Sequence, residues 1–414
     1  MASDDFLAKY AELLIGTCLG ISKGTRLRIR CEAPHRGLAR LIAIAAWKRG
    51  AREVMVQYAD PLLDRAAIES MNDGWLDDIS KFTRDEYSRF ADEGWAYLRI
   101  QGEEDLEALE GLESSRLQRW DRTRSIEVLP FLHAMAAFTV PWCTAPAPTE
   151  AWARWVFTTS GWTMPDDPVA ALWETFLPIL RLDRPDPAAA WLADVMNLGA
   201  RAELMTQHRF DSLHFYGPGT DLRVGLSPSS LWKNAIGTTH EGKRFTPNLP
   251  SEEIFSTPDA RRTSGRVTVT RPVRVMGVMV ENAWFRFEKG EVVESSATRN
   301  AEALACCLAS ETGMRRLGEV ALVECDSPVA KSKLIFGNIL LDENAACHIA
   351  LGLGIEETFE NVQAMDGPAR EAAGFNEAID HLDFMIGSDK IDVDGLESSN
   401  RITAVMRAGK FVLA

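Results

Sequence analysis

The chain has 414 residues, of which 46% are hydrophobic and 25% charged, and its net charge is −15 from 45 basic and 60 acidic residues. This composition is that of an ordinary globular protein, and the length favours two or three domains. The acidic balance argues against binding to nucleic acid or to an anionic membrane surface, because a phosphate-binding face needs clustered lysine and arginine.

The N-terminal segment "MASDDFLAKYAELL" is acidic where a signal peptide is basic, and no apolar run reaches the about 18 residues that a membrane span needs. The 7 cysteines are odd in number and scattered, and Cys306 and Cys307 lack C-x-x-C spacing. We interpret the cysteines as reduced thiols, which predicts a cytoplasmic location.

The first half of the sequence alternates between strand-like and helix-like segments. Apolar residues recur with helical spacing in some segments and alternate with polar residues in others. Strands and helices joined in turn by short loops are typical of a parallel sheet. We therefore predict an α/β N-terminal domain with a mainly parallel sheet over residues 1–185. Its expected helices include 4–19 and 35–50, and its expected strands are 25–31, 52–59 and 94–100.

The pattern changes after the segment "RLDRPDP". Asp186 and Pro187 suit the N-cap and first turn of a helix, which we expect to run to about His208. Alternating runs over 266–297 are typical of an antiparallel meander. We predict an α+β C-terminal domain over residues 186–414, in which the metal site lies. Its further expected elements are a helix at 299–310 and strands at 318–325, 381–387 and 410–414.

Adjacent carboxylates stand in the stretch "NLPSEEIFSTPD". The flanking prolines predict a stiff segment, so one glutamate could bind a metal while the other serves as general base. The plain alternative is a capping box with Ser251 as the N-cap. Further on, Glu319 precedes the apolar run "VALV", where a buried charge needs a partner. The alternative there is a solvated strand end.

Histidines occur in two other polar stretches. In "DENAACHIALG" we expect a helix that begins at Asp342 or Asn344 and places His348 one turn in; the alternative is a core histidine behind a helix cap. In "HLDFMIGS", His381 and Asp383 share one face of a strand, as two metal ligands on a rigid element would. The alternative is an ordinary surface pair, since H-x-D spacing is common.

In this order and with these flanks, "EEIF", "LGEVALV", "DENAACHIALG" and "HLDFMIGS" resemble the thermophilic-aminopeptidase family over nearly the whole chain. This family of dinuclear metallo-aminopeptidases includes aminopeptidases T and S and PepS. The resemblance implies that two divalent metal ions are held by five ligands, namely Glu253, Glu319, His348, His381 and Asp383.

The resemblance also implies roles for these groups. Zinc or cobalt suits the mixed carboxylate and imidazole set, with manganese or iron as further candidates, and Glu319 is the expected bridge. Glu252, directly before a ligand, is the expected general base, and Glu343 is the second candidate. The implied activity is removal of N-terminal residues from short peptides, or hydrolysis of a related small amide, by a metal-activated water. The implied assembly is a homodimer whose active sites face an enclosed cavity.

Two positions depart from the family pattern. The family has a tyrosine seven residues after the histidine, where this chain has Ile355, and usually a serine where this chain has Ala378. A phenol there would donate to the oxyanion, and losing one such donor costs about 10²–10³ in rate. This favours, as an alternative function, a member of the same fold that acts on an aromatic amine or ring.

A ring-cleaving dioxygenase group of similar fold gives that alternative a concrete form. It uses one iron on two histidines and a carboxylate, which His348, His381 and Asp383 could supply. Retention of Glu253 and Glu319 argues against it, since one iron does not need them. A third reading is a binding protein with a degenerate site, which five surviving ligands disfavour.

Overall fold

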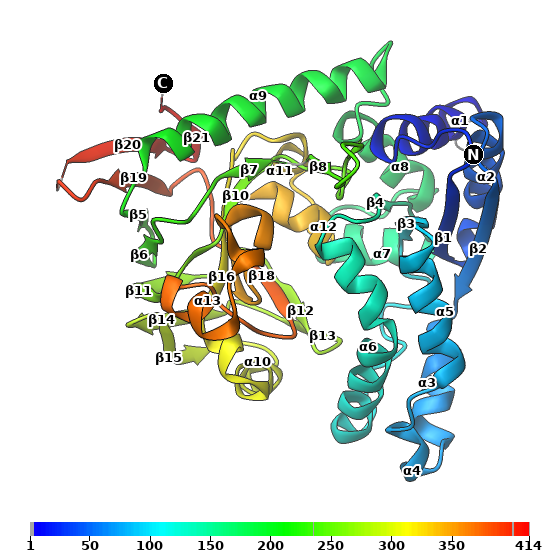
Figure 1. Ribbon diagram of the computed structural model, residues 1–414, viewed down its shortest axis with the longest axis horizontal. Coiled ribbons are helices and arrows are strands. Elements are labelled where there is room, and N and C mark those ends of the chain that lie inside the picture. The colour runs from blue at the N-terminus through cyan, green and yellow to red at the C-terminus, as the bar shows by residue number, and fades with distance from the viewer. Residues whose placement is uncertain (1–3, 235, 400, 414) are drawn as a thin grey trace. The chain divides into compact units, whose positions relative to one another are not determined.

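The computed structural model describes residues 4–234, 236–399 and 401–413, and the chain forms two compact units (Figure 1). The first comprises Met1–Trp191 and Ile236–Leu249, and the second Leu192–Ala235 and Pro250–Ala414. The domain division at residues 185 and 186 stays a prediction. Across the described parts of the chain, no helix has both the length and the apolar character that crossing a membrane requires.

A four-stranded sheet with strand order β2-β1-β3-β4 forms the centre of the first unit, and every neighbouring pair is parallel. This confirms the predicted α/β class and the parallel sheet. Helices of this unit begin at residues that cap them, because the side chain of the N-cap accepts hydrogen bonds from N–H groups of the first turn. The N-caps of this kind are Asp60, Ser80, Thr149 and Asp167. The strands are β1 (Arg26–Glu32), β2 (Glu53–Ala59), β3 (Ala96–Gln101) and β4 (Trp142–Pro146).

Most helices of the first unit are α-helical, and the predicted N-terminal helix changes character part-way along. It begins as α1 (Asp4–Glu12) and continues as the π-helical turn Leu13–Cys18. The others are α2 (Arg36–Lys48), α3 (Pro61–Ser70), α4 (Asp73–Leu76), α5 (Lys81–Asp92), α6 (Ser114–Ala136), α7 (Glu150–Thr159) and α8 (Pro168–Ile179), with a small hairpin of β8 (Gly237–Thr238) and β9 (Arg244–Phe245).

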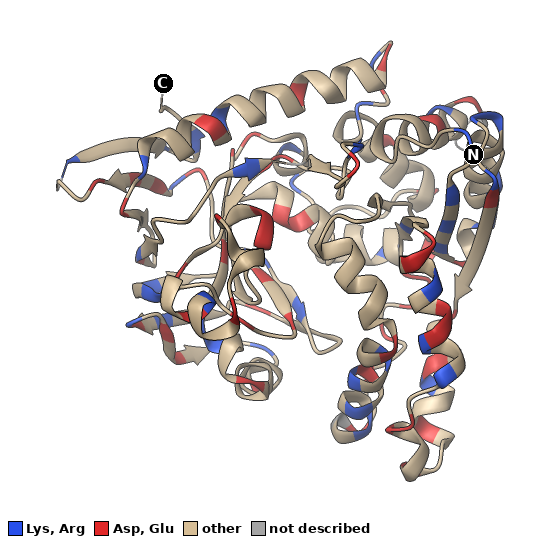
Figure 2. Ribbon diagram, viewed as in Figure 1, with Lys and Arg blue, Asp and Glu red and all other residues tan. Residues whose placement is uncertain are grey.

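Charged residues of both signs are interleaved along α5 and α6 (Figure 2). Arg116 and Arg119 of α6 pair with Asp73 and Asp77, which begin and cap α4. Exposed ion pairs of this kind contribute about 0–1 kcal/mol each to the free energy of folding. They therefore connect α6 to α4 but stabilise the fold only weakly.

A buried arginine lies inside the first unit's aromatic core. Arg28 of β1 is 1% exposed, donates to the Tyr87 hydroxyl at 2.7 Å and lies over the rings of Tyr87 and Phe90 at 4.4 and 4.5 Å. Burial removes the guanidinium from water, and the faces of the two rings stabilise its charge by cation–π attraction, which contributes about 2 kcal/mol for a desolvated pair.

The second unit is rich in sheet, as the predicted α+β class requires. An eight-stranded sheet has order β15-β14-β11-β6-β5-β19-β20-β21, and a five-stranded sheet has order β18-β17-β16-β10-β7. The first comprises β5 (Ser212–Gly217), β6 (Thr220–Leu226), β11 (Pro258–Thr268), β14 (Trp284–Glu288), β15 (Glu291–Ser296), β19 (Asp392–Leu396), β20 (Ile402–Arg407) and β21 (Lys410–Phe411). The second comprises β7 (Lys233–Asn234), β10 (Glu253–Ser256), β16 (Leu317–Val323), β17 (His348–Gly352) and β18 (His381–Met385).

The predicted long helix runs over Pro187–His208 and is thereby confirmed, although its first residues, up to Trp191, belong to the first unit. The expected helix at 299–310 is also present. The connecting elements are α9 (Pro187–His208), the pair β12 (Val273–Val275) and β13 (Val278–Val280), α10 (Ala301–Ser310), α11 (Pro328–Ser332), α12 (Ile339–Asp342) and α13 (Gly367–Ala373), with 3₁₀ turns at Thr312–Arg315, Glu343–Ala345, Glu356–Thr358 and Val362–Ala364.

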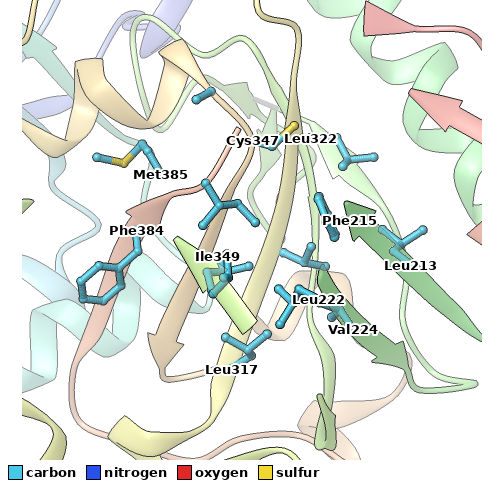
Figure 3. Close-up of a cluster of buried hydrophobic side chains, with 14 of the residues drawn as sticks. Leu213, Phe215, Leu222, Val224, Leu317, Leu322, Cys347, Ile349, Phe384 and Met385 are labelled. Atoms are coloured by element: carbon cyan, nitrogen blue, oxygen red, sulfur yellow. The ribbon is translucent and has the colours of Figure 1, made fainter. Parts of the chain in front are cut away.

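One hydrophobic cluster joins the two large sheets of the second unit (Figure 3). Leu322 and Ile349 come from the five-stranded sheet, and Phe215 and Leu222 come from the eight-stranded sheet. All residues of β16 are buried. Its core-facing residues, such as Leu322, pack in this cluster and support the sheet from one side. The other face of the sheet carries the polar residues described next.

Candidate metal centre

Four neighbouring strands of the five-stranded sheet carry the five residues expected to bind metal. Glu253 opens β10, and Glu319 lies near the start of β16. His348 opens β17, while His381 and Asp383 both lie on β18. Because side chains two apart on a strand share a face, this arrangement brings groups from distant sequence segments to one surface, which we call the ligand face.

The strand register shows which small residues lie between these groups. Glu319 is opposite Ala350, which in turn is opposite Asp383, and Ala321 is opposite His348. Ala321 and Ala350 therefore lie on the ligand face, between its polar groups. Their single methyl groups leave room above the sheet that larger side chains would fill.

A β-bulge at Gly318 allows Leu317 to pack in the core while Glu319 lies on the ligand face. Leu317 is opposite Leu351 and Glu319 is opposite Ala350, so Gly318 is the extra residue of the bulge. In a regular strand Leu317 and Glu319 would share a face, yet Leu317 packs in the core. A Cβ at Gly318 would collide with the carbonyl oxygens of Gly352 and Leu353, so the bulge needs glycine here.

The ligand face contains two groups of close donor atoms that share Glu319. We call Glu253, Glu319 and His348 the inner group, and Glu319, His381 and Asp383 the outer group; within each, the ligand atoms lie within 4.8 Å of one another. Glu319 Oε1 lies 3.9 Å from His348 Nε2, and its Oε2 lies 2.9 Å from His381 Nε2. One carboxylate therefore faces two histidines with different oxygens, as a bridging ligand does.

Both imidazoles present the same nitrogen to the cluster. His348 Nδ1 lies 3.1 and 3.2 Å from the carbonyl oxygens of Glu343 and Ala346, and His381 Nδ1 lies 2.7 Å from that of Leu353. A carbonyl oxygen only accepts, so each Nδ1 is the donor. Each Nε2 then points at carboxylates, the orientation that backbone contacts give to metal-binding histidines.

The donor atoms fit a cation. His348 Nε2 lies 3.1 Å from Glu253 Oε2, His381 Nε2 lies 3.5 Å from Asp383 Oδ1, and both carboxylate oxygens are buried. Burial alone would lower the pKa of His348, but the hydrogen bond and charge of Glu253 and the charge of Glu319 raise it well above its usual value. A neutral Nε2 facing a carboxylate is repelled unless a proton or a metal ion lies between them.

The outer group shows the same balance. Burial opposes protonation of His381, yet the charges and hydrogen bonds of Asp383 and Glu319 raise its pKa well above the usual value. Burial also opposes ionisation of Asp383, but the charge and hydrogen bond of His381 hold its pKa below the usual value. Burial raises the pKa of Glu319, against the hydrogen bond from His381. The cluster favours positive charge at both histidines.

The inner and outer groups differ in solvent access. The His348 side chain is 1% exposed and that of Glu253 is 8% exposed. The His381 side chain is 29% exposed. A solute would therefore reach the ligand face from the His381 side.

The two glutamates expected to act as base lie in different surroundings. Glu343 is buried, and burial followed by the charges of Glu253 and Asp383 raises its pKa well above the usual value. The charges of the ligand residues therefore act directly on the Glu343 carboxyl. Glu252 is half-buried, and its backbone N–H donates to Asn344 Oδ1 at 2.5 Å.

The expected helix that begins at Asp342 or Asn344 and places His348 one turn in is wrong. The helical turns end at Ala345, and His348 begins a strand. Asp342 does not cap a following helix; it pairs with Arg271 at 2.5 Å and accepts from the Phe336 N–H at 3.2 Å. The run after His348 is paired on both sides by β16 and β18, so sheet pairing outweighs the local helical pattern.

Two residues that shape the centre were not predicted from the sequence, namely Gly318 and Ala350, whereas Asn344 was expected only as a possible start of a helix. The glycine in the segment "LGE" is the one local signal of the bulge. No local signal indicates which residues lie opposite one another on neighbouring strands. Ile355 is half-buried, and its backbone exchanges hydrogen bonds with the Thr257 hydroxyl at 2.8 and 3.2 Å.

Comparison with known proteins gives this centre a family. The model of the thermophilic metalloprotease (M29) family matches residues 3–411. Aminopeptidase T of Thermus aquaticus is 37% identical over 408 residues, and that of Thermus thermophilus is 38% identical over 408 residues, each covering 98% of both chains. A solved structure, wild-type AmpT from Thermus thermophilus, superposes with a TM-score of 0.91 at 36% identity over 99% of this chain and 100% of that one. The chain belongs to the thermophilic metalloprotease (M29) family.

Proposed function

We propose that this chain is a metal-dependent aminopeptidase and that the ligand face is its active centre. The family supports the reaction class, and relatives 37% and 38% identical carry the name aminopeptidase T. The observation that carries the placement of the centre is the Glu319 carboxylate, whose two oxygens face two different histidines.

Two divalent metal ions are the proposed cofactors, with zinc or cobalt first and manganese or iron as further candidates. The inner and outer groups would each hold one ion, and Glu319 would contact both. When bound, such a pair lowers the pKa of a water molecule and polarises a peptide carbonyl. Residues of the chain would orient the substrate, transfer the proton and select the substrate.

Glu343 is the proposed general base, with Glu252 as the second candidate. The carboxyl of Glu343 is buried among the ligand residues, whose charges raise its pKa. A carboxyl that is reluctant to ionise both takes up and returns a proton readily near neutral pH. Glu252 directly precedes Glu253, and its backbone N–H donates to Asn344 Oδ1.

The proposed cofactors support selection of a free amino terminus. Four buried carboxyl groups, those of Glu253, Glu319, Glu343 and Asp383, lie close together, and two divalent ions held there would balance their charge. A bound ion would offer a ligand position to the unprotonated amino group of a peptide N-terminus, and an acylated N-terminus could not take that position. We propose short peptides as substrates, reaching the centre from the His381 side.

The single-iron alternative is not retained. Glu253 and Glu319 both lie within ligand groups, although a triad of two histidines and one carboxylate would leave Glu253 without a role. Ile355 in place of the family tyrosine then bears on rate within peptide hydrolysis, and does not change the class of reaction.

Assembly, location and domain structure are proposed on the resemblance and composition alone. We propose a homodimer in the cytoplasm, with folding domains that divide near residue 185. Light scattering on the purified protein tests the dimer: a mass near twice 45.9 kDa supports it, and the monomer mass contradicts it.

Metal removal and readdition test the proposed function. Protein stripped with chelator should lose the release of leucine from leucine amide, and zinc or cobalt should restore it together with two bound ions per chain. The matched substrate is N-acetyl-leucine amide, which should not be cleaved. A protein that holds two ions and leaves every amino-acyl amide and dipeptide intact would contradict the assignment.

A further inference from the structure

Asn344 connects two parts of the proposed active centre that are far apart in the sequence. It is fully buried, at 0% exposure. Its Oδ1 accepts from the Glu252 N–H at 2.5 Å, directly before the ligand Glu253. Its Nδ2 donates to Glu343 Oε1 at 3.4 Å and to the Leu340 carbonyl oxygen at 2.8 Å.

These contacts use both ends of the amide. The oxygen faces a backbone donor, and the nitrogen faces acceptors, including the Pro250 carbonyl oxygen at 3.4 Å. Reversing the amide would place donor against donor and acceptor against acceptor, so the contacts determine its orientation. Aspartate has the same shape but no N–H, and it would add a carboxylate beside Glu343.

We propose that Asn344 is a positioning residue that sets the distance between the ligand Glu253 and the carboxyl of Glu343. The inference rests on the proposed function of both residues. The oxygen end holds the backbone of Glu252, directly before β10. The nitrogen end holds the Glu343 carboxyl together with the Leu340 and Pro250 carbonyl oxygens. A group displaced by about 1 Å costs about 10²-fold in rate, so this one side chain affects both metal binding and proton transfer.

Two substitutions separate the two ends. Asn344→Ala removes both contacts, so the affinity for the inner metal ion and kcat should each fall by about 10–100-fold. Asn344→Asp keeps an acceptor for the Glu252 N–H and loses the donor to Glu343 and to the Leu340 and Pro250 carbonyl oxygens. Its metal affinity should stay within threefold of the native value while kcat falls by about 10–100-fold. KM should change little in either variant.

The matched control is Ser327→Ala. The Ser327 hydroxyl donates to the backbone oxygen of Asn344 at 2.7 Å and caps α11 by accepting from the Ala330 N–H, so its hydrogen bonds among the described residues go to backbone groups. Its loss should lower the thermal unfolding temperature while metal affinity and kcat stay within threefold. A purely structural role for Asn344 predicts instead that its variants behave as Ser327→Ala does.

Metal affinity is measured without substrate, by competition of zinc between the protein and a chelating dye. If Asn344→Ala does not fold, Asn344→Asp decides. Native metal affinity and kcat in a folded Asn344 variant would overturn the inference, as would equal losses in Ser327→Ala. A native protein that binds no metal and cleaves no amide would instead overturn the proposed function.

Discussion

Glu343→Gln tests the central proton-transfer step. The substitution preserves the shape of the side chain and an oxygen for the Asn344 amide, but it removes the group that takes up a proton. Glu343 is 7% exposed and lies among Glu253, Glu319 and Asp383, so bulk water cannot substitute for it. Loss of a positioned general base costs about 10²–10⁴ in kcat, or about 3–5 kcal/mol in activation free energy. KM should stay within about threefold.

Steady-state hydrolysis of leucine amide, with metal content measured on the same sample, is the assay for this prediction. The variant should hold as much metal as the native protein. Glu252→Gln is the matched control and should retain kcat within about threefold. A metal-replete Glu343→Gln with native kcat refutes the reasoning, and a large loss confined to Glu252→Gln moves the role of base to Glu252.

Three further predictions follow from the same geometry. His381→Ala should lose one metal ion per chain and keep the ion of the inner group, whereas His348→Ala should retain the outer ion; equal loss of both ions in each variant, by elemental analysis, would contradict separate groups. Gly318→Ala should disrupt the bulge, so metal content and thermal stability should fall together, and native values of both would show that the strand tolerates a Cβ there. Glu357, whose pKa burial raises from 4.5 to about 7, is protonated more readily in the folded state, so stability should fall by at most about 3 kcal/mol as pH rises from about 5 to about 8. In Glu357→Gln, the free energy of unfolding measured in urea should fall less between pH about 5 and pH about 8 than it does in the native protein. The same pH dependence in both proteins would refute this prediction.

The class of each unit was predictable from local pattern. Alternation of strands and helices before residue 185 indicates a parallel sheet, and turn residues between 266 and 297 indicate antiparallel strands, because side-chain period and turn chemistry are local properties. The start of α9 at Pro187 was readable for the same reason. Residues 236–249 belong with the first unit, and no local feature of their sequence indicates it.

The site required information that local pattern does not hold. His348 follows three polar residues typical of a helix start, yet pairing with β16 and β18 makes it a strand residue. Glu319 and Ala321 alternate regularly with the core residues Val320 and Leu322, but one extra residue, Gly318, places Leu317 on the core side as well. The likeness of whole motifs to a known family identified the candidate ligands, whereas their joint geometry depends on strand register.

The place of β18 in its sheet has a consequence for how a new chain acquires its ions. β18 is the edge strand and the last of the five in sequence, and it brings two donors of the outer group. The core behind the ligand face also includes Phe384, Val393 and Met406, so the sheets that support the inner group need the last strands of the chain. Because a domain generally folds as a unit, we expect both groups to be completed together, near the end of synthesis.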